Sequence, residues 1–271
     1  MTQPLTDAIN ALTRYANETT GQSDTTLSDA VRTLCDGYGG GGGYTVNEVV
    51  ERNYTGDMVY TGTMQNLPSY ALAGSGITSF ESSSILQFGG NNAFNGCHSL
   101  ERVSLPNCVA NNESRGSLFS SCTSLTDVNL PKVQHFGQYC FDGCTALETI
   151  ALPSLARLQN YTFRNCSRLK KADVGKSDRT NSNTFNGCTV LTDLIIRRTS
   201  GVCALTNINA FTNTPFASGG TGGTLYVPQS LISSYQSASN WSTILGYANN
   251  SIQAIEGSQY ENYYADGTHI E

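Results

Sequence analysis

The chain has 271 residues and a net charge of -6, and only 13% of its residues are charged, whereas Ser, Thr and Asn together contribute 83. This acidic balance excludes a general nucleic-acid binder, which needs a face rich in Lys and Arg to neutralise phosphates. We expect neither a secretory signal nor membrane insertion, because the N-terminus has no basic and apolar leader and no run of about 18 apolar residues occurs.

The first 36 residues carry two short amphipathic helical patterns. Apolar residues recur at helical spacing from Leu5 to Tyr15, and a capping-box pattern at Thr26 precedes a second apolar stripe that ends at Leu34. Isolated helices of this length are rarely stable in water, so we expect them to pack on copies of themselves or on another protein. The sequence predicts a helical anchoring and oligomerisation module at 1–36 and a flexible Gly-rich linker at 37–44.

Five segments in the middle of the chain align without a gap on the pattern F-x-x-C-x-x-L-x-x-V-x-L. Their Phe residues are separated by 25, 22, 22 and 22 positions, a period typical of leucine-rich solenoids. A shorter copy begins at Tyr70 and a degenerate one at Phe211, which predicts about seven coils. The ladder residues of the five copies are Phe94 and Cys97, Phe119 and Cys122, Phe141 and Cys144, Phe163 and Cys166, and Phe185 and Cys188.

Alternation after each Cys predicts a short strand with one buried face. In the third copy Ile150 and Leu152 point inward, while Thr149 and Ala151 point outward. One coil buries little by itself, so the coils must stack and share a core. We therefore predict an α/β-type repeat solenoid of short parallel strands over residues 45–224.

The C-terminal part contains a predicted cap and a Tyr-rich tail. Thr224 to Val227 is expected to be the last strand and Gln229 to Ala238 a helix, within a cap at 225–258 that covers the end of the core. The tail at 259–271 is either free or a contact strip.

Several phrases resemble a known repeat family. AFNGCHSLERVSLP, CFDGCTALETIALP, AGSGITSF and TLYVPQSLISSYQSASNW are similar to BspA-type leucine-rich repeats over about residues 56–256. The resemblance implies a right-handed leucine-rich repeat stack and a surface-exposed binding or adhesion protein. Two inserts, at 107–116 and 197–209, lengthen their coils and are either binding loops or sequence drift.

The N-terminal string LTDAINALTRYANETTGQSDTTLSDAVRTLCDGYGGGG carries a second resemblance. It is similar to the helical segment that opens many phage and prophage tail-associated proteins of Gram-positive hosts. This resemblance implies a place in a phage tail.

The cysteines and histidines do not form a recognisable reaction site. Zinc ligands come as close Cys pairs, which only Cys140 and Cys144 approach, so we expect free, buried, structural thiols and no metal or cofactor. The three His residues lie far apart, and no nucleophile motif is present. We expect no catalytic residues.

The outward strand positions form two columns. Arg102, Asp127, Thr149, Lys171 and Asp193 align in one, and Ser104, Asn129, Ala151, Asp173 and Ile195 in the next. Only Asp173 and Asp193 could form the acid pair of a solenoid glycan-degrading enzyme, and Lys171 beside them would keep both ionised. The stretch 163–179 has a net charge of +4, either as solvated turns or as a patch for an anionic polymer. The predicted binding surface is Arg102, Asp127, Asn129, Lys170, Lys171, Asp173 and Asp193.

Two functional interpretations follow, both non-enzymatic. The first is a phage tail-associated, receptor-binding protein of the virion that contacts a host surface glycan or protein through its solenoid. Its residues 1–36 would bind other tail proteins or form a homo-oligomer. The alternative is a BspA-like adhesin at the bacterial cell surface or secreted. The lack of a leader favours the first, and a glycan-degrading solenoid enzyme is a further, weaker alternative.

Overall fold

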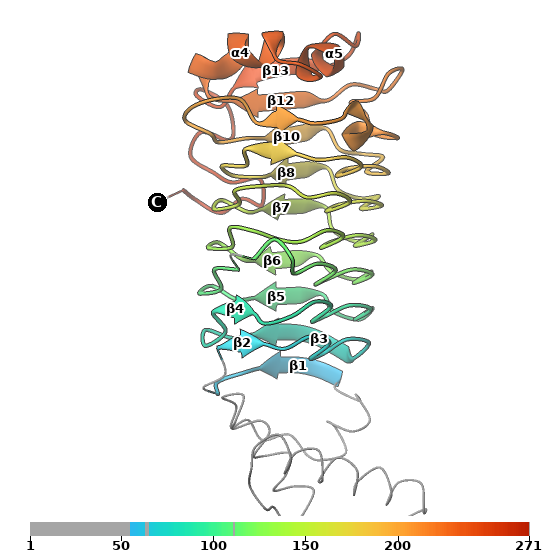
Figure 1. The fold of residues 1–271 in the computed structure, drawn as a ribbon, viewed down its shortest axis with the longest axis vertical. Helices are drawn as coiled ribbons and strands as arrows, with labels where there is room; N and C mark the ends of the chain where they lie inside the picture. Colours follow the sequence, from blue (N-terminus) through green and yellow to red (C-terminus); the bar gives the residue numbers. More distant parts are fainter. Residues whose placement is uncertain (1–54, 63–64, 111, 271) are drawn as a thin grey trace, which may run out of the picture.

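A computed structural model describes residues 55–62, 65–110 and 112–270. In it, short parallel strands stack along one long axis (Figure 1). The predicted module at 1–36 and linker at 37–44 lie outside these residues. A first sheet has the order β1-β3-β5-β6 and a second the order β13-β12-β10-β8-β7, all in parallel pairs. Their bounds are β1 (Thr55–Val59), β3 (Gly76–Glu81), β5 (Arg102–Ser104), β6 (Asp127–Asn129), β7 (Thr149–Ala151), β8 (Lys171–Asp173), β10 (Asp193–Ile195), β12 (Thr224–Val227) and β13 (Ser251–Ala254).

The parallel solenoid is the predicted fold, but it is longer than the repeat count suggests. The two sheets contain four and five strands, so nine strands are stacked in the described residues. The two additional strands are β1, which pairs with β3, and β13, which pairs with β12 and follows the expected last strand. Neither segment carries the Phe and Cys motif. Backbone pairing with a neighbouring strand is sufficient to continue the ladder.

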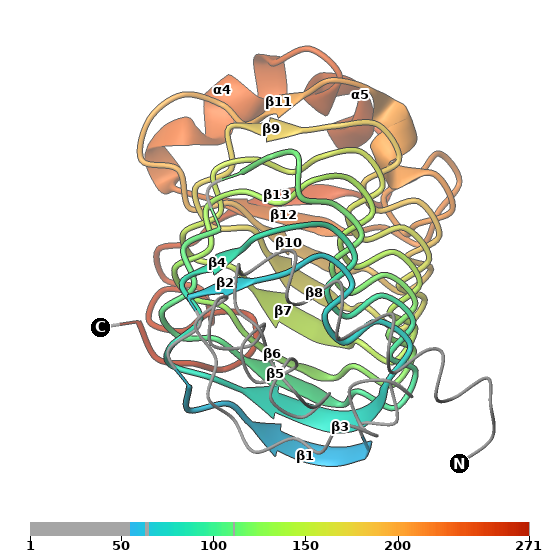
Figure 2. The same ribbon diagram turned by 60° about the horizontal axis from the view of Figure 1, so that its bottom comes forward.

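Shorter strands form a second wall on the other side of the core. β2 (Asn66–Leu67) pairs with β4 (Gln87–Phe88), and β9 (Arg179–Thr180) pairs with β11 (Ala204–Leu205). Figure 2 shows this wall facing the nine-strand wall across the core. Each coil therefore crosses from one wall to the other and back.

Aromatic rings run the length of the core in a single column. Phe94, Phe119, Phe141, Phe163 and Phe185 are fully buried, and successive rings are stacked with centroids 5.1 to 5.6 Å apart. The turn before each Cys has a left-handed residue, such as Gly143 at φ 74° and, one coil earlier, Ser121 at φ 61°. Gly fits this position without steric cost, which explains the recurring Asn-Gly and Asp-Gly pairs.

Helical turns cover the C-terminal end of the core. They are η1 (Ile208–Phe211), η2 (Gln229–Leu231), α4 (Ile232–Ser237) and α5 (Trp241–Leu245). The Trp241 indole donates to the Cys203 carbonyl at 2.6 Å, and the Cys203 amide donates to the Tyr235 hydroxyl at 2.9 Å. The second insert is therefore bound by the terminal helices. No helix within the described ranges has the length and apolarity that a membrane span requires.

Candidate functional site

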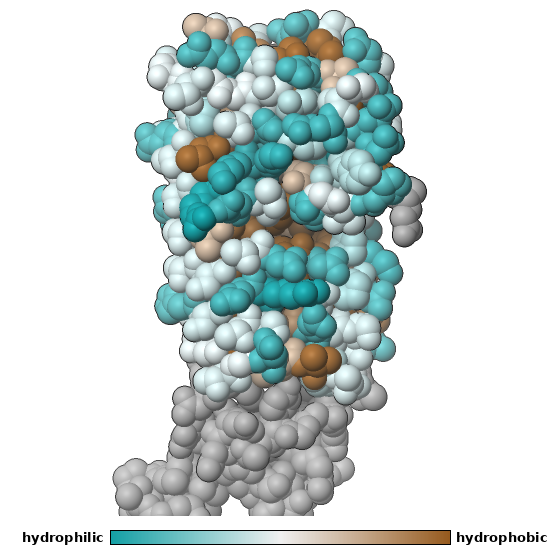
Figure 3. All heavy atoms as spheres, turned by 180° about the vertical axis from the view of Figure 1, so that it is seen from behind, coloured by the Kyte–Doolittle hydropathy of each residue, from teal (hydrophilic) through white to brown (hydrophobic). Residues whose placement is uncertain are grey.

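The outer face of the nine strands presents parallel columns of side chains. The register places Ser79, Arg102 and Asp127 side by side on neighbouring strands, and likewise Thr149, Lys171 and Asp193. This reproduces the predicted column, except that β6 and β7 are not paired and the column is interrupted between them. Figure 3 shows that this face is mostly hydrophilic.

No other described segment covers the N-terminal half of this face, and we call the outward side chains of β3, β5 and β6 the open strand face. Arg102 lies at its centre, with Nε 3.3 Å from Glu81 and 3.4 Å from Asp127. All three side chains are 42 to 56% exposed, so these ion pairs are weak and easily exchanged. In the second column Asn129 donates to the Ser104 hydroxyl at 2.9 Å.

The C-terminal segment, residues 255–270, covers the outer face of the second sheet. Figure 1 shows it running back along the stack from β13 toward β7. Ile195 and Tyr226, on the outer face of β10 and β12, are buried in a cluster with Ile255 and Tyr260. The tail is therefore a contact strip on its own solenoid.

This cover corrects one predicted binding residue, Asp173, and places Tyr260 against two others, Lys171 and Asp193. Asp173 is fully buried, the Asp193 carboxylate accepts a hydrogen bond from the Tyr260 hydroxyl, and the Lys171 ammonium lies 5.8 Å from the centre of the Tyr260 ring. Strand alternation placed these residues outward correctly. Strand alternation is a local pattern, so it could not predict that a segment more than 60 residues away in the chain folds back over these residues.

Arg197 connects the buried carboxylate to this segment, and sequence reasoning missed its role. Its Nε donates to Asp173 at 2.8 Å, and its two terminal nitrogens donate to the carbonyls of Tyr260 at 2.9 Å and Tyr263 at 2.7 Å. Burial raises the pKa of Asp173, and the Arg197 charge partly offsets that rise. An ion pair with Arg197 and the contact with Tyr260 leave Asp173 and Asp193 unavailable as an acid pair for glycan cleavage.

Three of the six Lys and Arg side chains in the basic stretch 163–179 form salt bridges. Arg164 pairs with Asp142, and Arg168 and Lys170 both pair with Glu148. The Arg164 guanidinium also lies over the stacked rings of Tyr139 and Tyr161. These contacts favour solvated turns with paired charges rather than a patch for an anionic polymer.

The ladder thiols lie inside the core as free cysteines. Each donates to a carbonyl on the preceding coil, for example Cys166 Sγ to Phe141 O at 3.1 Å. Burial raises the pKa values of Cys97, Cys122, Cys144 and Cys166, and it raises those of Cys108 and Cys203 to about 12. Thiols held protonated in this way are poor nucleophiles and poor metal ligands. No cluster of three or more His, Cys, Asp or Glu side chains suited to a metal occurs within the described ranges.

Comparison with known proteins identifies the repeat. The family model of the BspA type leucine rich repeat region matches residues 56–132 and 115–219 in six copies. The chain belongs to this family. No curated protein matches the chain.

Two solved structures resemble this family member. A leucine-rich repeat protein from Bacteroides ovatus ATCC 8483 is 17% identical, with a TM-score of 0.41 over 74% of this chain and 42% of that one. A leucine rich cell surface protein from Faecalibacterium prausnitzii A2-165 is 15% identical, with a TM-score of 0.39 over 65% of this chain and 64% of that one. The chain spans less than two thirds of the length of either. Neither protein is described as a phage component.

Proposed function

We propose that this BspA-type protein is a non-enzymatic binding protein that contacts a carbohydrate-bearing surface through the open strand face. The observation that carries the proposal is the polar outer face of β3, β5 and β6, centred on Arg102, which the described residues leave open. The corresponding face of the second sheet is occupied by the protein's own C-terminal segment.

The open strand face suits a ligand with many hydroxyl groups. Arg102, Ser104 and Asn129 provide hydrogen-bond donors and acceptors on strands spaced about 4.8 Å apart, and the ladder holds them rigidly. A rigid surface loses little conformational entropy on binding, so many weak contacts can sum to useful affinity. Asp57, Glu81 and Asp127 outnumber Arg102 on and beside this face, which disfavours a strongly anionic polymer.

We further propose that the protein acts at the bacterial cell surface as an adhesin. The family resemblance supports this location, because such repeats occur chiefly in surface-exposed binding proteins. The interpretation as a phage tail component depends on residues 1–36, which lie outside the described residues, and none of the comparisons supports it.

A glycan microarray probed with the full chain tests the binding surface. We expect binding to neutral oligosaccharides that Arg102→Glu and Asp127→Lys each weaken. Arg168→Glu is the matched control, because it alters an exposed, paired Arg outside the face. Loss of binding in Arg168→Glu alone would move the site to the neighbouring turns, and cleavage of any arrayed glycan would contradict the non-enzymatic assignment.

We also propose that residues 1–36 form an assembly module that makes a homo-oligomer or binds a partner protein. A truncated chain that starts at Tyr44 should keep the thermal unfolding transition of the repeats and lose any self-association seen by light scattering. Unfolding of the repeats in that truncated chain would instead make these residues a cap of the solenoid.

A further inference from the structure

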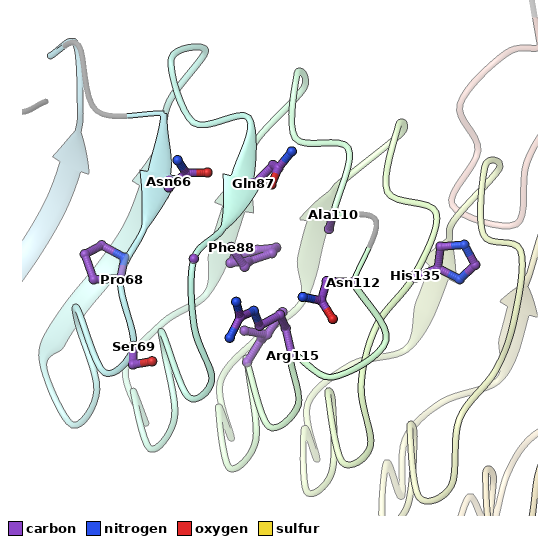
Figure 4. A pocket seen from close by; sticks show the side chains of 11 residues that line it. Asn66, Pro68, Ser69, Gln87, Phe88, Ala110, Asn112, Arg115 and His135 are labelled. Carbon is purple, nitrogen blue, oxygen red and sulfur yellow. The ribbon is translucent and has the colours of Figure 1, made fainter. Parts of the chain in front are cut away.

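A concave pocket of about 490 Å³ lies on the short-strand wall, on the opposite side of the core from the open strand face. Asn66 and Gln87 line it from β2 and β4, and Asn112 and Arg115 from the first insert. Figure 4 shows Arg115 beside Phe88 and Asn112, with His135 at the far end. The first insert therefore builds one wall of this pocket.

The Arg115 guanidinium is not neutralised within the described residues. Its Nε is buried without a hydrogen-bond partner, and no Asp or Glu lines the pocket. The nearby Glu113 is directed elsewhere, to Arg157 at 3.0 Å and Gln159 at 3.0 Å. It also lies 3.3 Å from His135 Nδ1, which makes no well-aligned hydrogen bond. A buried donor on a cation is costly unless a ligand satisfies it.

Close backbone packing holds Arg115 in place before any ligand binds. Gly137 donates its amide to the Arg115 carbonyl at 2.8 Å, and Ser117 donates to the Gln138 carbonyl at 2.8 Å. A Cβ on Gly137 would lie 2.6 Å from the backbone of Arg115 and Gly116, so only glycine permits this approach. The insert is thus pinned to the next coil on both sides of Arg115.

Apart from Arg115 and His135, the pocket is lined by uncharged residues, most of them of two kinds. The side chains of Asn66, Ser69 and Gln87 are exposed and make no hydrogen bond within the part of the chain that the structure describes. Phe88, Ala110 and Leu118 form an apolar floor. One cation, several amide and hydroxyl groups and an apolar floor match a ring with one carboxylate, several hydroxyls and a C–H face.

We propose that this pocket binds an acidic sugar, with the hexuronate carboxylate on Arg115. The guanidinium fork matches a planar carboxylate with two parallel hydrogen bonds. Asn66, Gln87 and Asn112 line the same pocket and offer amide donors and acceptors for the sugar hydroxyls. The site is separate from the open strand face, so it does not depend on the proposed function.

Calorimetric titration of the full chain with a glucuronate-containing disaccharide tests the pocket. We expect Arg115→Gln to weaken binding by about tenfold or more, since a charge-assisted hydrogen-bonded pair is lost. The affinity of Arg115→Lys should lie between those of the unsubstituted chain and Arg115→Gln, because Lys keeps the charge but lacks the two-pronged guanidinium donor. Arg168→Gln is the matched control and should leave this binding unchanged, because Arg168 is an exposed, paired Arg outside both the pocket and the open strand face.

Three results would overturn the proposal. They are unchanged binding in Arg115→Gln, equal binding of the neutral glucose disaccharide, and full competition by inorganic phosphate at equal concentration, which would indicate a general anion site. If Arg115→Gln unfolds, the exposed variants Asn66→Ala and Gln87→Ala take its place, and each should weaken the disaccharide without lowering the unfolding temperature.

Discussion

The thiol of Cys144 donates a hydrogen bond to the carbonyl oxygen of Phe119, 25 residues earlier in the chain, at 3.1 Å. The same carbonyl accepts the amide of Cys122 at 3.1 Å, so it closes its own turn and also contacts the next coil. Cysteine suits this position because it is small and apolar and carries a weak donor.

Cys144→Ala should destabilise the protein by about 1–3 kcal/mol, because it removes the hydrogen bond and leaves a small cavity. Cys144→Asp should cost more, since it would place a carboxylate among buried Phe and Leu side chains. Urea unfolding followed by circular dichroism measures both. An Asp variant as stable as the Ala variant would show that this position is not sealed from water.

The buried thiols should not react in the native protein. In a Cys35→Ser background, which removes the cysteine outside the described residues, native chains should take up little thiol reagent near neutral pH. Denatured chains should take up one reagent at each of the eight others. The reason is that burial raises the thiol pKa, to about 12 for Cys108 and Cys203, so thiolate is scarce. Rapid labelling of native chains would contradict the ladder.

Arg197→Met should destabilise the protein by about 3–5 kcal/mol near neutral pH, because it leaves the Asp173 carboxylate buried without its partner. Asp173→Asn combined with Arg197→Met should be less damaging than Arg197→Met alone. A double-mutant cycle in urea measures this coupling.

The pH dependence of Arg197→Met provides a second test. The pKa of Asp173 is raised in the folded chain, and the loss of Arg197 should raise it further. A raised carboxyl pKa favours folding at low pH, and that advantage is lost as pH rises through the folded value. The loss in the free energy of unfolding caused by Arg197→Met should therefore become smaller as the pH falls. A loss that becomes larger would contradict the ion pair with Asp173.

The C-terminal segment should detach in alkaline solution. Burial and the hydrogen bond to Asp193 raise the pKa of Tyr260 above its ordinary value. Its contribution to docking is therefore complete below about pH 10 and is lost as pH rises toward the folded pKa. Limited proteolysis should cut within 255–270 more readily at high pH, and in Tyr260→Phe at neutral pH. Tyr263→Phe, on a half-exposed ring, is the control and should leave cleavage unchanged.

The repeat pattern predicted the core well because each Phe and Cys meets its counterpart one period away. The strand face was predicted only in part. Arg102 and Asn129 are open, but Asp173 is covered, since its cover depends on Arg197 and Tyr260, which follow no repeat. The concave pocket on the short-strand wall could not be predicted from the sequence either. The insert was visible as extra residues, but the placement of Arg115 depends on close backbone packing against Gly137, and a single Gly has no distinctive sequence signal.

The missing pairing between β6 and β7 has a mechanical consequence. Backbone hydrogen bonds still join these two coils elsewhere, as from Phe119 to Cys140 and from Ser121 to Asp142. On the short-strand wall Ala156 donates to the Gln134 carbonyl at 2.8 Å, so at this level the two coils are joined at the turns and on that wall but lack strand pairing on the nine-strand wall. Under load, the coils of β6 and β7 should separate on the nine-strand wall. The solenoid would then change its curvature at mid-length while each half stays stiff.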